Sequence, residues 1–132
     1  MPLSFDHKPS LVAYLTCGDP DLATSRDIAI AAIDAGADVI ELGVPFSDPV
    51  ADGPVIQRAS ERALRHGTTL QQVLELGKEI RKRSPAGLII FTYLNPVMRM
   101  GLMKFSTAVL DAGIDGALIT DLPVEESHHY LS

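Results

Sequence analysis

Residues 41–54 read ELGVPFSDPVADGP, and they join an apolar segment to a loop rich in turn-forming residues. The apolar segment, residues 39–44, has the composition of a buried strand but carries a carboxylate at Glu41. A charge inside a buried strand is costly unless it has a use. Parallel α/β proteins place their chemistry in the loops that follow their strands. We therefore expect this strand and its loop to hold functional residues, with Asp48 and Asp52 as further carboxylates.

Short apolar segments recur on both sides of this stretch. Strands are predicted at residues 11–16, 39–44, 88–94 and 117–121, because each is a short apolar run bounded by glycine, proline or aspartate. Longer helical patterns separate them. Short strands between longer helices indicate a parallel sheet, so the predicted fold class is α/β.

The helical segments have recognisable ends. Asp19 followed by Pro20 is typical of an N-cap with proline at the first helical position. Thr69 and Gln72 form a capping-box pattern for a helix that runs to about Arg83. Asn95 before Pro96 reads as a cap for a short helical turn. Further helices are expected after Gly53, at residues 102–112 and from Pro123 onward.

Two five-residue segments resemble each other. Residues 34–38 read DAGAD and residues 111–115 read DAGID, and each lies between a predicted helix and a predicted strand. Repeated βα units suggest a barrel built by duplication, although a match of five residues also arises by chance.

Alternation along the strands predicts which side chains share the face of Glu41. That face combines apolar, aromatic and hydroxyl groups with one carboxylate, as in a pocket for a flat, partly apolar ligand. Tyr14, Phe91, Tyr93, Leu118 and Thr120 are the candidate substrate-binding residues. Core packing is an equally open interpretation of Phe91 and Tyr93. The full set is Val12, Tyr14, Thr16, Val39, Glu41, Gly43, Ile89, Phe91, Tyr93, Gly116, Leu118 and Thr120.

Length and composition exclude several classes of protein. The 132 residues suffice for a single domain, residues 1–132, and the net charge of -6 argues against nucleic acid or an anionic membrane as partner. Cys17 is the one cysteine, so no disulfide forms within the chain, which fits a cytoplasmic protein. No signal peptide or membrane span is expected. No metal site is expected either, since His128 and His129 are adjacent on a helix and point apart.

The quoted stretch resembles the signature of the tryptophan synthase alpha subunit family. Three flanking segments match that family in order and spacing: TCGDPD at residues 16–21, YLNPV at residues 93–97 and DLPVEES at residues 121–127. A signature of this length is far more specific than a short glycine pattern.

The resemblance implies a (β/α)8 TIM barrel that cleaves indole-3-glycerol phosphate to indole and glyceraldehyde 3-phosphate in tryptophan biosynthesis. It implies that Glu41 is the general acid/base and that Asp52 assists at the indole nitrogen. It also implies an alpha2-beta2 complex, in which indole passes through a tunnel to a beta subunit that holds pyridoxal phosphate, while the alpha chain has no cofactor. Pro45, Asp48 and Asn95 become candidates for the interface with that subunit.

The proposed roles agree with the chemistry, yet simpler interpretations stay open. Retro-aldol cleavage needs a proton delivered to indole C3 and a proton removed from a hydroxyl of the glycerol chain, which suits a carboxyl group. A second carboxylate stabilises positive charge on the nitrogen. Alternatively, Glu41 lies at a ragged strand end in solvent. Asp48 and Asp52 alternatively serve only as turn or cap residues.

The matched family motifs end after four βα units. We therefore expect residues 1–132 to form a half barrel, truncated after strand four and inactive alone, since barrel phosphate sites lie after strands seven and eight. Its open edges and apolar face favour association. Two other functions remain: a non-catalytic half barrel that only docks a partner subunit, and another phosphate-binding TIM-barrel lyase.

Overall fold

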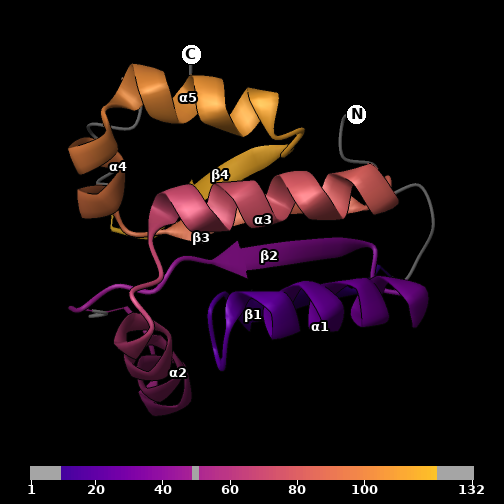
Figure 1. The fold of residues 1–132 in the computed structure, drawn as a ribbon, viewed down its shortest axis with the longest axis horizontal. Helices are drawn as coiled ribbons and strands as arrows, with labels where there is room; N and C mark the ends of the chain where they lie inside the picture. The colour runs from indigo at the N-terminus through magenta and orange to yellow at the C-terminus, as the bar shows by residue number, and fades with distance from the viewer. Residues whose placement is uncertain (1–9, 49–50, 122–132) are drawn as a thin grey trace.

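A computed structural model describes residues 10–48 and 51–121 as one parallel four-stranded sheet with helices (Figure 1). The strands are β1 (Val12–Thr16), β2 (Val39–Gly43), β3 (Gly87–Thr92) and β4 (Gly116–Ile119). They lie side by side in the order β1-β2-β3-β4, and each pair is parallel. This arrangement confirms the predicted α/β half barrel, because each new strand is added beside the previous one.

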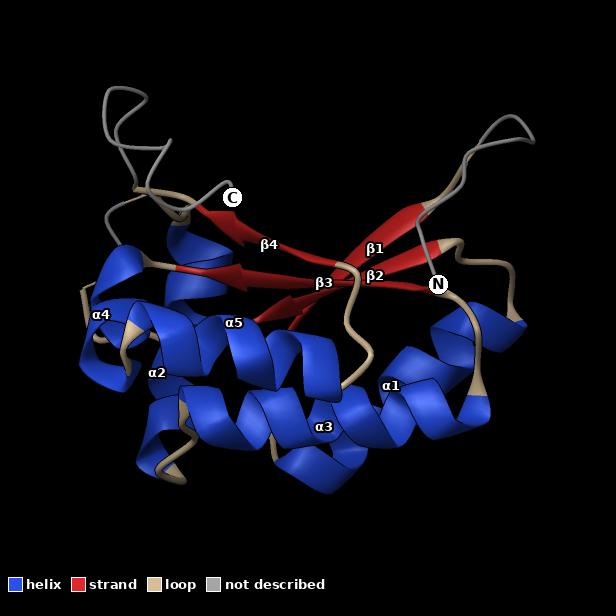
Figure 2. Cartoon of the chain, turned by 90° about the horizontal axis from the view of Figure 1, so that it is seen from above, coloured by secondary structure: helices blue, strands red, loops and turns tan. Residues whose placement is uncertain are grey.

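Three helices cover one face of the sheet, and two lie at its end. Figure 2 shows α1 (Leu22–Asp34), α3 (Leu70–Arg83) and α5 (Leu102–Asp111) on the covered face. The helices α2 (Pro54–Arg65) and α4 (Leu94–Met100) lie near the end to which the strand arrows point (Figure 1). Within the described residues, no helix lies on the opposite face (Figure 2). The carboxyl ends of the strands and the open face therefore border the same space.

The core lies between the sheet and the covering helices. Ile40 and Leu42 of β2 and Leu88 and Ile90 of β3 are fully buried. Each apolar side chain buried in this way contributes roughly 1.5–3 kcal/mol relative to an exposed one. Because these four residues occupy alternate positions, the opposite alternate positions face away from the helices.

The strand register confirms the predicted open face. Tyr14 pairs with Glu41, and Glu41 pairs with Ile89 on its other side. One row nearer the carboxyl ends, Gly43 pairs with Phe91. Neighbours in register point to the same side of a parallel sheet, so these residues share one face.

The two similar segments have the same local structure. The N–H of Leu11 donates to Oδ2 of Asp38 at 2.7 Å, and the N–H of Leu88 donates to Oδ2 of Asp115 at 2.9 Å. Each aspartate thus holds the backbone at the start of the preceding strand. Gly36 and Gly113 occupy matching positions before them, and both have positive φ angles. The repeat inferred from these two five-residue segments is therefore also a repeat of local structure.

Several predicted boundaries were wrong. Asp21, not Asp19, is the N-cap of α1, since its Oδ1 accepts a hydrogen bond of 2.7 Å from the N–H of Thr24. Asp19 instead pairs with Arg62 of α2 through two contacts of 2.9 and 3.0 Å. Asn95 is not a cap, because α4 begins one residue earlier.

Smaller differences concern strand ends. β3 ends at Thr92, and Tyr93 is the N-cap of α4, so residues 93–94 are not strand. β2 and β4 also end earlier than expected, at Gly43 and Ile119. The helix expected from Pro123 lies outside the described residues. No helix of the described part has the length and apolar character needed to span a membrane.

Candidate active site

Glu41 lies at the centre of the open face. It is the third of the five residues of β2 and is partly buried between the neighbouring strands. Because strands border it on both sides, the alternative position at a ragged strand end is wrong. Its carboxylate belongs to a face that is otherwise built from aromatic, aliphatic and hydroxyl side chains.

Tyr14 occupies the space that the missing side chain of Gly43 leaves open. A Cβ atom at Gly43 would lie 2.2 Å from Oη and 2.5 Å from Cζ of Tyr14. The ring also meets Phe91 edge to face, with the centroids 5.1 Å apart and the planes at 77°. Glycine at position 43 therefore allows the Tyr14 ring to reach along the sheet toward the carboxyl ends of the strands.

Burial raises the pKa of Tyr14 to about 12, although the Thr16 hydroxyl, which donates to Oη at 3.4 Å, lowers it in part. The negative charge of Asp52 raises it further. The phenol is therefore neutral throughout the physiological range and serves as a hydrogen-bonding group.

Asp52 is held by groups from two other elements. The N–H of the preceding residue, Ala51, donates to Oη of Tyr93 at 2.7 Å. The carbonyl of Asp52 accepts a hydrogen bond of 2.8 Å from Nε2 of Gln57 in α2. Asp52 is partly buried. Contacts with the start of α4 and with α2 therefore hold the backbone around the second predicted catalytic residue.

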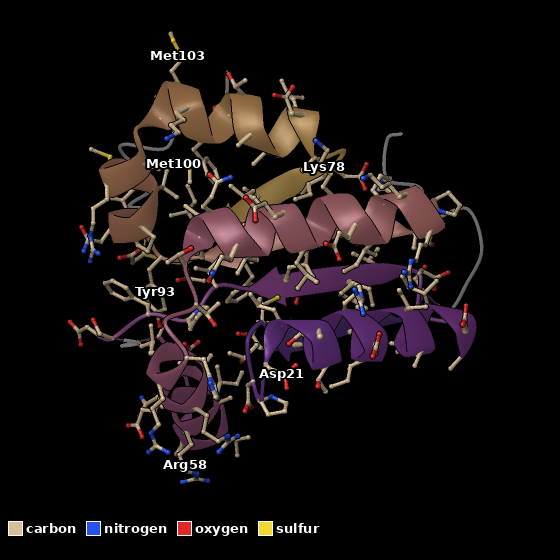
Figure 3. The ribbon with its side chains drawn as sticks, in the orientation of Figure 1. Asp21, Arg58, Lys78, Tyr93, Met100 and Met103 are labelled. Carbon is tan, nitrogen blue, oxygen red and sulfur yellow. The ribbon has the colours of Figure 1, made fainter. Side chains whose placement is uncertain are left out.

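Tyr93 lies deeper than the predicted pocket lining. The residue is only 3% exposed, and its ring stacks on Phe46 with the centroids 5.2 Å apart and the planes at 28°. Burial raises the pKa of Tyr93, the Ala51 N–H lowers it in part, and the Asp52 carboxylate raises it further. Figure 3 labels this side chain, which lies between α4 and α2 in that view.

Leu118 and Thr120 lie at the β4 side of the face. Leu118 is in register with Phe91 and is 46% exposed. Thr120 follows the end of β4, and its hydroxyl donates to the carbonyl of Thr92 at 3.4 Å. The structure therefore brings Tyr14, Phe91 and Leu118 together with Glu41, whereas the hydroxyl of Thr120 contacts the neighbouring backbone.

The three candidate interface residues are placed differently. Asp48 and Asn95 are exposed, whereas Pro45 is buried. Pro45 lines a hollow of about 340 Å³ together with Phe46 and Pro96. The residues around this hollow come from the loop after β2 and from α2, α3 and α4, outside the open face.

Sequence reasoning missed Phe46, Ala51 and Gln57 as parts of the site. An aromatic residue directly after a proline in a turn-rich loop was a signal for Phe46. Ala51 contributes only its backbone N–H, which donates to Tyr93. The pattern of side chains in the sequence does not indicate such a contact. In the part of the chain that the structure describes, no three His, Cys, Asp or Glu side chains form a group able to hold a metal ion.

Comparison with known proteins shows which sequences this chain is similar to. The family model described as tryptophan synthase alpha chain matches residues 3–132. The tryptophan synthase alpha chain of Solibacter usitatus (strain Ellin6076) is 52% identical over 130 residues, which cover 98% of this chain and 49% of the relative. That of Dechloromonas aromatica (strain RCB) is 52% identical over 126 residues, or 95% of this chain and 47% of the relative. The chain thus spans about half the length of the curated relatives it matches.

Solved structures give the same result. Tryptophan synthase subunit alpha from Legionella pneumophila str. Paris superposes with a TM-score of 0.91 and 42% identity, over 93% of this chain and 47% of that chain. A chain of the tryptophan synthase complex from Pyrococcus furiosus gives a TM-score of 0.87 and 40% identity, over 92% of this chain and 50% of that one. Sequence and fold together show that this chain belongs to the tryptophan synthase alpha chain family.

Proposed function

We propose that the protein containing this chain cleaves indole-3-glycerol phosphate to indole and glyceraldehyde 3-phosphate. The observation that carries the proposal is the position of Glu41, a partly buried carboxylate in the middle of an open, largely apolar sheet face. Membership of the tryptophan synthase alpha chain family supports the same reaction. The face is suited to a flat aromatic substrate, because Tyr14 and Phe91 line it with rings set edge to face.

In this mechanism Glu41 moves the protons. Its carboxyl group delivers a proton to C3 of the indole ring, and the resulting Glu41 carboxylate accepts the proton of the hydroxyl on the adjacent carbon of the glycerol chain. The bond between indole C3 and that carbon then breaks, and the electron pair returns to the ring as the aldehyde forms. Positive charge develops on the indole nitrogen when C3 is protonated, and the Asp52 carboxylate stabilises it.

A partner subunit completes the proposal. Solved structures similar to this chain include tryptophan synthase complexes. We assign the beta subunit as partner, with pyridoxal phosphate held there and no cofactor in this chain. Asp48 and Asn95 are exposed near the carboxyl ends of the strands, where they are available for contact, and Pro45 is buried in the same loop as Asp48.

The proposed activity is tested in a protein that contains these residues and is as long as the relatives. Glu41→Gln keeps the shape of the side chain and removes the titrating group, so indole formation should fall by at least about a hundredfold. Asp52→Asn should cause a smaller loss, because its role is electrostatic. Indole release is measured by steady-state assay, and thermal unfolding confirms that both variants fold. Turnover of Glu41→Gln at the unmodified rate would refute the acid/base assignment.

The partner is tested separately. Asp48→Ala in the complex should weaken mutual activation of the two subunits more than it weakens cleavage by the alpha chain alone. Equal losses in both assays would instead assign Asp48 a catalytic or structural role. Asn95→Ala provides a second exposed position for comparison.

A non-catalytic half barrel that docks a partner is the second candidate, and the open edges of β1 and β4 in the described sheet favour it for residues 1–132 alone. For that polypeptide we expect binding to the beta subunit without indole release. Measurable indole release from the purified polypeptide would exclude this candidate.

A further inference from the structure

Tyr93 contacts both arms of the loop that carries Asp52. On one arm its ring stacks on Phe46, three residues after the end of β2, with the centroids 5.2 Å apart. On the other arm its Oη accepts a hydrogen bond of 2.7 Å from the N–H of Ala51, the residue directly before Asp52. Tyr93 itself is anchored at the start of α4 as the N-cap residue.

The surroundings of Tyr93 restrict the role of its hydroxyl. The residue is only 3% exposed, so little of it is available to a ligand on the open face. Its oxygen already accepts from the backbone, and the adjacent Asp52 carboxylate is a cause of the raised pKa of the phenol. In this position the hydroxyl contacts the loop that carries Asp52.

From these contacts we infer that Tyr93 is a positioning residue, whose hydroxyl holds the Ala51 backbone and thereby directs the Asp52 carboxylate toward the substrate. The inference rests on the proposed function and replaces the predicted role of Tyr93 as a substrate contact. Gln57 supports the same residue from the other side, because its Nε2 donates to the Asp52 carbonyl at 2.8 Å. Asp52 is therefore held through its own carbonyl and through the N–H of its predecessor.

A double-mutant cycle in the full chain tests the link between Tyr93 and Asp52. Tyr93→Phe keeps the ring on Phe46 and removes only the hydroxyl. We expect kcat for indole formation to fall about tenfold, the cost of one lost hydrogen bond that is needed in the transition state. In the Asp52→Asn background the same change should cost less than about twofold, because the group that Tyr93 directs is already gone. Equal losses in both backgrounds would overturn the inference, as would a rise in KM at constant kcat.

A second measurement is independent of activity. In Tyr93→Phe the amide proton of Ala51 should exchange with solvent at least about tenfold faster, since its hydrogen-bond acceptor is removed. Tyr14→Phe is the matched control, because it removes the other phenol near Asp52 and should leave exchange at Ala51 unchanged. Unchanged exchange in Tyr93→Phe would overturn the inference. Absence of indole formation by the unsubstituted protein would count against the proposed function alone, and the exchange comparison would still decide whether Tyr93 holds the loop.

Discussion

The guanidinium group of Arg81 donates a hydrogen bond of 2.8 Å to the carboxylate of Asp115, whose side chain is only 5% exposed. The same guanidinium donates to three backbone carbonyls, those of Gly113, Ser84 and Ala86, at 2.7, 3.0 and 2.6 Å. Arg81 therefore joins the end of α3 to the turn between α5 and β4. Asp115 in turn holds the start of β3, so one ion pair connects four elements of the fold.

Arg81→Ala should be strongly destabilising. Removal of the guanidinium leaves the buried Asp115 carboxylate without its cation, which costs about 3–5 kcal/mol of unfolding free energy. Lys82→Ala is the control, since Lys82 is the exposed neighbour with the same charge and should change stability by less than about 0.5 kcal/mol. Urea unfolding measures both variants. Similar small effects of the two substitutions would contradict the role given to Arg81.

Gly43→Ala should disturb the aromatic part of the open face. The new methyl group would lie 2.2 Å from Oη and 2.5 Å from Cζ of Tyr14, so the ring must move. Overpacking of this kind costs about 1–3 kcal/mol. In a Tyr14→Ala background the same substitution should cost much less, because the clashing ring is absent. Comparison of the two unfolding free energies checks this, and an equal cost in both backgrounds would show that the contact with Tyr14 is not the cause.

The stability of the fold should decrease at high pH through Tyr14. Burial raises its pKa from 10.0 to about 12, so the folded protein keeps a proton that the unfolded chain loses. The contribution is complete below pH 10 and is lost as the pH rises to about 12. Unfolding free energies measured between these values should fall with pH, and less steeply in Tyr14→Phe. A variant with an unchanged slope would show that other groups cause the decrease.

The sequence predicted local structure correctly where the hydrogen-bonded residues lie close together in the chain. Thr69 and Gln72 form the predicted capping box, because both hydrogen bonds join residues three apart. The assignment of Asp19 failed for the opposite reason. Its partner Arg62 lies 43 residues away, and a contact of that range leaves no periodic signal in the sequence.

The sequence by itself determined the order of strands and helices and the face on which Glu41 lies. These follow from the two-residue period of a strand and from the rule that parallel neighbours in register point the same way. The repeat of the two segments that end at Asp38 and Asp115 was likewise recognisable from the sequence.

Only the tertiary structure decided how the loop residues meet. It placed the Tyr93 hydroxyl on the Ala51 N–H, 42 residues apart, and the Tyr14 ring over Gly43. It also buried Tyr93, which is only 3% exposed. Loop conformation depends on contacts between segments that are distant in sequence and on backbone groups that every residue carries. The identity of the residues alone therefore does not specify these contacts, and the packing of the whole sheet and its helices does.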